Sequence, residues 1–125
     1  MAEMEFFPQW PESHPTIYAY EFVGVASHQG YIKVGYTDRD VETRVKEQIH
    51  TAAVPYRILG QWSAMKNDGS CFTDHDVHAV LKAKGKQQLN AGEDRNEWFK
   101  CTLNDVKAAV VAVQTGAENV EERTQ

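Results

Sequence analysis

The stretch from Tyr31 to Ile49 constrains the fold more than any other part of this sequence, because it combines a strand, a corner and a helix. Ile32 and Val34 alternate with Lys33, which is the pattern of a half-buried strand. Gly35 then lets the backbone leave that strand without a side chain in the way. Further on, apolar residues recur at four-residue spacing, as on the buried side of an amphipathic helix: Val41, Val45 and Ile49.

The helix in this stretch should begin close to the corner. Thr37 or Asp40 can accept hydrogen bonds from the free N–H groups of its first turn. Arg44 lies off the apolar stripe, where its guanidinium can reach the strand that precedes the corner. We therefore expect a strand–turn–helix unit that holds an arginine near the end of a strand.

Further strands and helices are predicted on both sides of this unit. Thr16 to Val25 is rich in β-branched and aromatic residues and should pair with the next strand through a turn at Ser27 to Gly30. Its side chains alternate, with Ile17 and Ala19 on one face and aromatic residues on the other: Tyr18, Tyr20 and Phe22. The later segments predict a third strand at Tyr56 to Ala64, a helix at Thr73 to Lys84, a polar loop at Lys86 to Asn96, a short strand or extended piece at Glu97 to Cys101, and a helix from Thr102 to Gly116.

Length and charge indicate one domain between two polar flanks. The 125 residues are enough for a single core, and we expect an extended arm at 1–15, a folded domain at 16–115 and a polar tail or linker at 116–125. The net charge of −5 comes from the two flanks, so the folded part is neutral and permits a DNA partner without requiring one. Two cysteines, no signal peptide and no run of membrane-spanning length favour a cytoplasmic protein without membrane contact.

Side chains suited to phosphodiester cleavage are spread over these elements. They are Tyr18, Lys33 and Tyr36 on the first two strands, Arg44 on the first helix, Asp74 and His78 at i, i+4 on the second helix, and Glu97 after the polar loop. Cleavage needs a group that activates water, a cation that neutralises the developing phosphorane, and usually a divalent metal held by a carboxylate. Spacing alone does not select this chemistry.

The order of several short motifs resembles the phage-type branch of the GIY-YIG endonuclease superfamily. These motifs are Thr16-Ile17-Tyr18, Lys33-Val34-Gly35-Tyr36-Thr37, Arg44, the helix start with Asp74 and His78, and Glu97-Trp98-Phe99. Each motif alone is weak, but five in the same order over most of the folded part are specific. The resemblance implies an α+β fold with a three-stranded antiparallel sheet flanked by helices, and a DNA endonuclease that depends on Mg²⁺ or Mn²⁺.

The resemblance also implies roles for individual residues. It places Tyr18 beside the attacking water and Arg44 on the scissile phosphate, with further substrate contacts from Lys33 and Thr37. Because Lys33 stands where the family name has a tyrosine, Tyr36 is the candidate for the second hydroxyl. The implied metal ligands are Asp74 and Glu97, with His78 as a further catalytic candidate. Asp74 stands where the family has glutamate, and the lost methylene retracts the carboxylate by about 1.5 Å.

Each of these residues also has a purely structural interpretation. Tyr18 can be a packed strand aromatic, Arg44 an ion-paired helix residue beside Asp40 or Glu47, Asp74 a helix cap, His78 a hydrogen-bond donor and Glu97 the partner of a lysine. The second hypothesis is accordingly a catalytically weak DNA-binding or protein-docking module. The chain also resembles the nuclease-like domain that precedes a DEAD/DEAH-type helicase in some bacterial restriction or phage-defence proteins, which implies a helicase partner in the same polypeptide.

Overall fold

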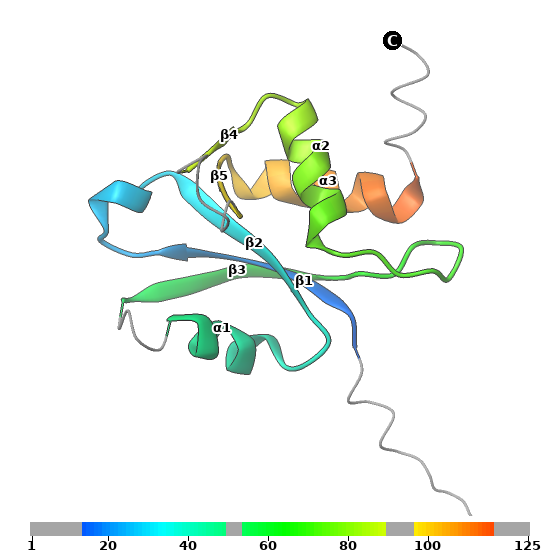
Figure 1. The fold of residues 1–125 in the computed structure, drawn as a ribbon, viewed down its shortest axis with the longest axis horizontal. Helices are drawn as coiled ribbons and strands as arrows, with labels where there is room; N and C mark the ends of the chain where they lie inside the picture. The colour runs from blue at the N-terminus through cyan, green and yellow to red at the C-terminus, as the bar shows by residue number, and fades with distance from the viewer. Residues whose placement is uncertain (1–13, 50–53, 90–96, 117–125) are drawn as a thin grey trace, which may run out of the picture.

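A computed structural model describes residues 14–49, 54–89 and 97–116. Its strands are β1 (Thr16–Phe22), β2 (Tyr31–Thr37), β3 (Tyr56–Ser63), β4 (Gln87–Gln88) and β5 (Trp98–Lys100). Its α-helices are α1 (Val41–Ile49), α2 (Asp74–Ala83) and α3 (Leu103–Thr115), and a 3-10 helix at Ala26–His28 forms the turn between β1 and β2 (Figure 1). The predicted order of strands and helices is therefore confirmed, with one additional strand.

The five strands form one antiparallel sheet in the order β3-β1-β2-β5-β4. The α+β class is confirmed, but the expectation of a three-stranded sheet is wrong. β5 pairs with the first half of β2, and the two-residue β4 pairs with β5. Both strands are too short to show the alternation of apolar and polar residues by which the longer strands are recognised.

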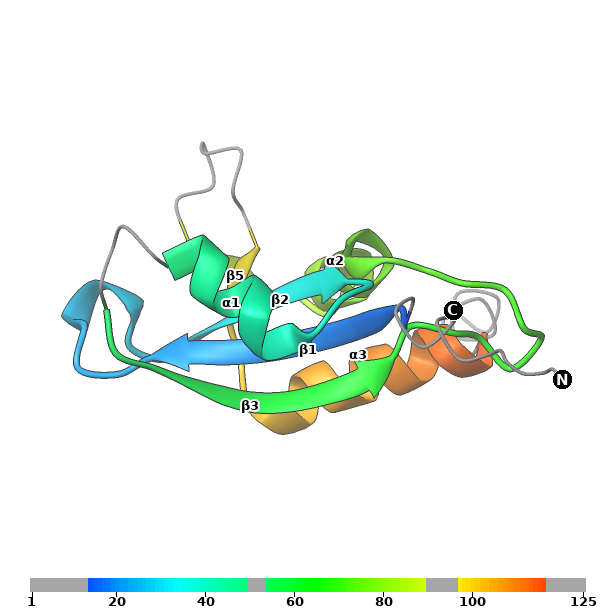
Figure 2. The same cartoon turned by 90° about the horizontal axis from the view of Figure 1, so that it is seen from below.

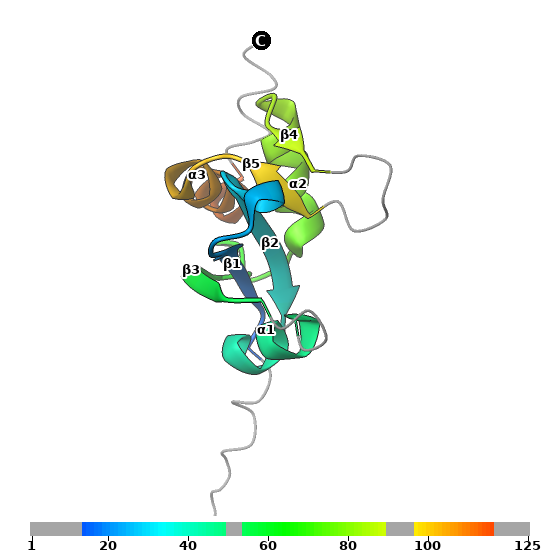
Figure 3. The ribbon, with the colours of Figure 1, turned by 90° about the vertical axis from the view of Figure 1, so that its left-hand side faces the viewer.

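The alternation in β1 divides the core into two layers, as its side-chain pattern predicts. Ile17 and Ala19 belong to a large apolar cluster between the sheet and the helices α2 and α3. Tyr18 and Tyr20 belong to a smaller cluster on the opposite face, where α1 covers the sheet. Figures 2 and 3 show α1 on one side of the sheet and α3 on the other. The apolar stripe predicted for α1 is buried in the second cluster: Val41, Val45 and Ile49.

Helix ends follow the capping residues that the sequence offers. Asp40 Oδ2 accepts a hydrogen bond from Thr43 N at the start of α1, which identifies Asp40 as the cap. Thr73 and Thr102 form capping boxes with Asp76 and Asp105 at the starts of α2 and α3. Because Thr73 caps α2, Asp74 has no capping role and its carboxylate is available for other contacts.

Several predictions concern segments outside the described residues. They are the arm at 1–13, part of the connection after α1 at 50–53, most of the polar loop at 90–96 and the tail at 117–125. Among the described helices, none has the length and apolar character needed to cross a membrane.

Candidate functional site

Tyr18 lies on the α1 side of the sheet, directly opposite Gly35 in the register of β1 and β2. Its ring crosses over the glycine so closely that a Cβ atom at Gly35 would lie 2.4 Å from both Cζ and Oη of Tyr18. Any larger residue would displace the phenol, since real Cβ atoms do not approach so near. The corner glycine therefore has a second use, which is to make room for the hydroxyl group of Tyr18.

Helix α1 places two polar side chains beside this hydroxyl. Gln48 Oε1 accepts a hydrogen bond from Tyr18 Oη at 3.0 Å and another from Tyr20 Oη at 3.3 Å. Arg44, one turn earlier on the same helix, interacts with Tyr18 through its charge and through a side-chain hydrogen bond. The sequence places Arg44 near the strand before the corner, which is β2; in the structure Arg44 interacts with Tyr18 on β1, the strand that pairs with β2.

Both phenols remain protonated at neutral pH. Burial raises the pKa of Tyr18, and the positive charge of Arg44 opposes that rise only in part. Burial also raises the pKa of Tyr20, and the neighbouring Tyr18 adds to the effect. The two rings stack with their centroids 6.1 Å apart. Neither phenol can serve as a phenolate base under ordinary conditions, but each can donate and accept hydrogen bonds.

Arg44 is held at the edge of a small ion-pair network. Glu47 receives a two-pronged contact from Arg39, at 2.7 and 3.2 Å, while its Oε1 lies 3.7 Å from Arg44 Nη1. Because the Glu47 carboxylate is committed to Arg39 and the Arg44 contact is longer, the Arg44 guanidinium keeps donors for another anion.

Lys33 and Glu97 form an ion pair next to the tyrosines. Lys33 Nζ lies 3.1 Å from Glu97 Oε1, with 9% of the lysine side chain and 29% of the glutamate side chain exposed. The ammonium group also lies 5.7 Å from the centre of the Tyr20 ring. The lysine is thus buried against an aromatic ring, and its charge is balanced by the carboxylate.

Asp74 and His78 approach β2 from the other side. His78 Nε2 lies 2.9 Å from the carbonyl oxygen of Val34 and 3.8 Å from Asp74 Oδ2. Because a carbonyl oxygen can only accept, His78 Nε2 carries the hydrogen and has no lone pair for a metal ion. Burial lowers the pKa of His78. Burial raises the pKa of Asp74, and the charge of His78 opposes that rise.

Glu97 links the two groups of side chains. Its charge adds to the rise in the pKa values of Tyr18 and Tyr20 on one side and of Asp74 on the other, and it opposes the lowering of the pKa of His78. We define the site cluster by the residues that these interactions connect: Tyr18, Tyr20, Lys33, Arg44, Gln48, Asp74, His78 and Glu97. They come from β1, β2, α1, α2 and the residue just before β5, so the cluster exists only in the folded chain.

Two of the predicted site residues lie apart from Tyr18. Tyr36 points to the opposite face of the sheet, where it packs against the large apolar cluster and interacts with Asp74. Thr37 is buried, and its Oγ1 accepts a hydrogen bond from Arg39 N, which shapes the turn into α1. The phenol next to Tyr18 is Tyr20, so the structure brings a different hydroxyl to Tyr18 than the one expected from the sequence.

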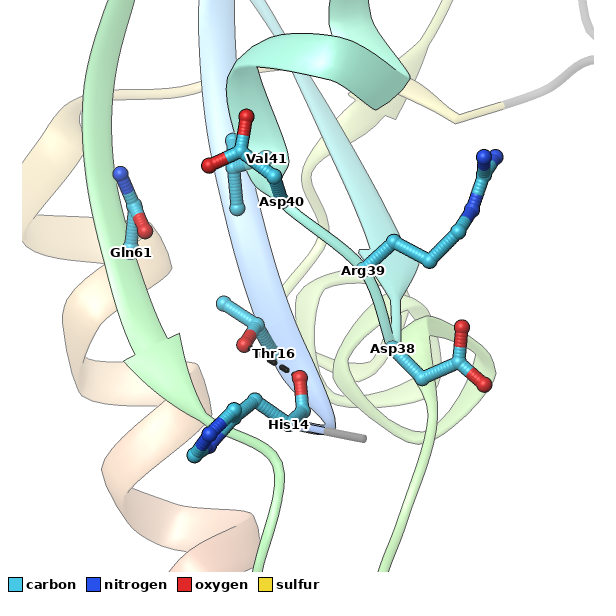
Figure 4. A pocket seen from close by; sticks show the side chains of 7 residues that line it. All are labelled: His14, Thr16, Asp38, Arg39, Asp40, Val41 and Gln61. Carbon is cyan, nitrogen blue, oxygen red and sulfur yellow. Dashed lines mark hydrogen bonds between the residues drawn. The ribbon is translucent and has the colours of Figure 1, made fainter. Parts of the chain in front are cut away.

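A separate hollow of about 580 Å³ opens beside the start of α1 (Figure 4). None of the predicted site residues lines it; its walls are His14, Thr16, Asp38, Arg39, Asp40, Val41 and Gln61. In Figure 4 the side chains of Asp38 and Arg39 extend away from Gln61 on the opposite wall. Two carboxylates at this hollow make it a poor receptor for a phosphate group.

The sequence interpretation missed Gln48 and Tyr20 as members of the site cluster. Both could have been found from spacing, since Gln48 follows Arg44 by one helical turn and Tyr20 follows Tyr18 on the same face of its strand. Residue type gave no signal, because glutamine is common on exposed helix faces and tyrosine is common in strands.

One of the comparisons with known proteins, the comparison with family models, found a match. The T5orf172 domain model matches residues 16–114, which is most of the chain. T5orf172 is a phage-associated domain related to nuclease folds of the GIY-YIG kind, compatible with a DNA-related function. No match was found among curated proteins or among solved structures. Because the family model covers nearly the whole described part of the chain, this protein belongs to the T5orf172 domain family.

Proposed function

We propose that this protein is a metal-dependent DNA endonuclease of the GIY-YIG type. The observation that carries the proposal is the site cluster itself. A phenol, a guanidinium and two carboxylates come from elements far apart in the sequence, and the charge of Glu97 acts both on Tyr18 beside Arg44 and on Asp74. Hydrolysis of a phosphodiester needs this combination of a water-orienting group, a cation and a metal-binding anion.

In the proposed reaction Arg44 binds the scissile phosphate and stabilises the charge that grows on its oxygens. The Tyr18 hydroxyl orients the attacking water. The water oxygen bonds to phosphorus, the bond to the leaving oxygen breaks, the water gives up one proton to solvent, and the leaving oxygen takes one up. Lys33, balanced by Glu97, supports the local charge without itself losing a proton.

Asp74 and Glu97 are the proposed ligands of Mg²⁺ or Mn²⁺. A bound ion would act as a Lewis acid on the phosphate and lower the pKa of bound water. The donor set suits such a hard cation, which needs only one or two carboxylates and otherwise takes water and phosphate oxygens. No three His, Cys, Asp or Glu side chains among the described residues converge to hold an ion by themselves. Burial and, to a smaller extent, the charge of Glu97 raise the pKa of Asp74, and a cation bound by both carboxylates would relieve that repulsion.

The second candidate function is a DNA-binding or docking module with weak catalysis. It is favoured because two cations near the site are already paired with carboxylates: Lys33 contacts Glu97, and Arg39 contacts Glu47. Few charges then remain for DNA phosphates, and a helicase domain in the same polypeptide could supply the affinity, as in restriction or phage-defence systems.

Cleavage assays on supercoiled, single-stranded and branched DNA distinguish the two functions. We expect nicking with Mg²⁺ or Mn²⁺ that EDTA abolishes, and loss of nicking in Asp74→Ala. Asp74→Glu should retain or increase the rate, because it restores the longer carboxylate side chain. A protein that binds DNA but cleaves none of these substrates with either metal, also as Asp74→Glu, would favour the docking module.

A further inference from the structure

Among the side chains that the structure describes, Gln48 alone accepts hydrogen bonds from the hydroxyl groups of both tyrosines in the site cluster. A carbonyl oxygen has two lone pairs, and the two phenols supply two hydrogens. The acceptor capacity of Gln48 Oε1 is therefore filled by Tyr18 and Tyr20.

This arrangement fixes the direction of the Tyr18 hydroxyl. A phenol has one hydrogen to donate and lone pairs with which to accept. Because the hydrogen of Tyr18 is directed to Gln48 and Arg44 can only donate to the Tyr18 oxygen, what remains for a partner on the open side is a lone pair of that oxygen. An acceptor suits the hydrogen of a water molecule, whereas a phosphate oxygen would require a donor. The close passage over Gly35 and the stacked Tyr20 ring leave the phenol little freedom to turn elsewhere.

We infer that Gln48 is a positioning residue that turns the Tyr18 hydroxyl into a hydrogen-bond acceptor for the attacking water. This inference rests on the proposed endonuclease function and goes beyond it, because it separates the water-orienting role of Tyr18 from the phosphate-binding role of Arg44. The raised pKa of Tyr18 agrees with it, since a neutral phenol can keep its hydrogen on Gln48 throughout the reaction. Gln48 acts through Tyr18 and does not touch the substrate.

Three variants at position 48 and one at position 18 test the inference. Gln48→Leu removes the acceptor at similar size, and Gln48→Glu keeps an acceptor but cannot donate. We expect kcat to fall about 10- to 100-fold in Gln48→Leu with KM for DNA little changed, since misdirection of a reacting group costs rate more than binding. Gln48→Glu should keep kcat within a few-fold of wild type, while its KM rises because the new carboxylate competes with DNA for Arg44. Gln48→Lys, a donor only, should behave like Gln48→Leu in kcat.

The combination with Tyr18→Phe shows whether Gln48 works through the phenol. Tyr18→Phe has no hydroxyl to direct, so adding Gln48→Leu to it should lower kcat by less than about two-fold further. Thermal unfolding of each variant must show a folded protein.

The outcomes separate this inference from the function on which it rests. If the wild type cleaves DNA but Gln48→Leu leaves kcat unchanged, the positioning role is wrong and the endonuclease function stands. Full activity in Gln48→Lys with loss in Gln48→Glu would show that the amide donates to Tyr18, which also overturns the inference. If the wild type cleaves no DNA, the proposed function and the inference fall together.

Discussion

The Tyr18 ring and Gly35 are packed so closely that a methyl group on the glycine would lie 2.4 Å from the Tyr18 hydroxyl oxygen. The strand register places the two residues opposite each other, and α1 closes over the ring from the other side. The position of the hydroxyl group is therefore set by the smallest residue of the neighbouring strand.

Gly35→Ala should lower stability and displace Tyr18. Overpacking of this kind costs about 1–3 kcal/mol, measured as the free energy of unfolding in urea. The same substitution in a Tyr18→Leu background should cost less, because the ring that meets the new methyl group is absent. Equal costs in the two backgrounds would contradict the proposed contact.

Glu97→Gln should destabilise the fold by leaving the buried ammonium of Lys33 without a charged partner. Removing one partner of such a contact costs about 1–3 kcal/mol, and the partial exposure of Glu97 keeps the loss towards the low end. Lys33→Met in the Glu97→Gln background should recover part of the loss, as a double-mutant cycle of unfolding free energies would show. No recovery would mean that the ion pair contributes nothing.

Stability should fall as the pH falls below about 6.5, in part because of His78. Burial lowers its pKa below the ordinary value of 6.5. Between the two pKa values the unfolded chain binds a proton that the folded protein does not, so acidification favours unfolding. Urea unfolding at about pH 7.5 and about pH 5.5 measures the effect, which should shrink in His78→Asn. Burial also lowers the pKa of His28, so the same measurement on His28→Asn shows how much of the pH effect belongs to each histidine.

Asp74→Asn should make the protein more stable at neutral pH. Burial raises the pKa of Asp74 above 3.8, so its charged form weakens the fold as the pH rises through and above that value. Asparagine removes the charge at nearly the same size. We expect a higher midpoint of thermal unfolding together with lost DNA cleavage, the behaviour of a residue kept for chemistry. A lower midpoint would indicate that the carboxylate serves the fold.

The fold could be predicted from the sequence where the signals are local and strong. The stripe of Val41, Val45 and Ile49 fixed the buried side of α1, and Thr102 with Asp105 predicted the start of α3. The pairing of β5 with β2 and of β4 with β5 could not be predicted, because Gln87–Gln88 has no pattern and its partner Trp98–Lys100 lies about ten residues further along the chain. Such contacts depend on tertiary structure that short segments do not encode.

The candidate site was predictable by residue type but not by contact. The motif order selected four candidates: Tyr18, Arg44, Asp74 and Glu97. In the structure Tyr18 interacts with Arg44 and Glu97, and the charge of Glu97 also acts on Asp74; their roles in catalysis stay a prediction. Tyr36 carries the expected hydroxyl but faces the other side of the sheet, which the alternation after Gly35 already implies. Glutamine has no distinctive chemistry of its own. Gln48 becomes a candidate only through the hydrogen bonds that it accepts from the hydroxyl groups of Tyr18 and Tyr20.

The rate of plasmid nicking by Arg44→Ala tests the central claim most directly, with Lys46→Ala as its matched control. Lys46 is an exposed cation on the same helix and lies outside the site cluster. If Arg44 stabilises the phosphorane, its loss should reduce metal-dependent nicking about 100- to 1,000-fold, while Lys46→Ala nicks like the wild type. Equal nicking by Arg44→Ala and wild type, or no nicking by wild type with Mg²⁺ or Mn²⁺, would contradict the account.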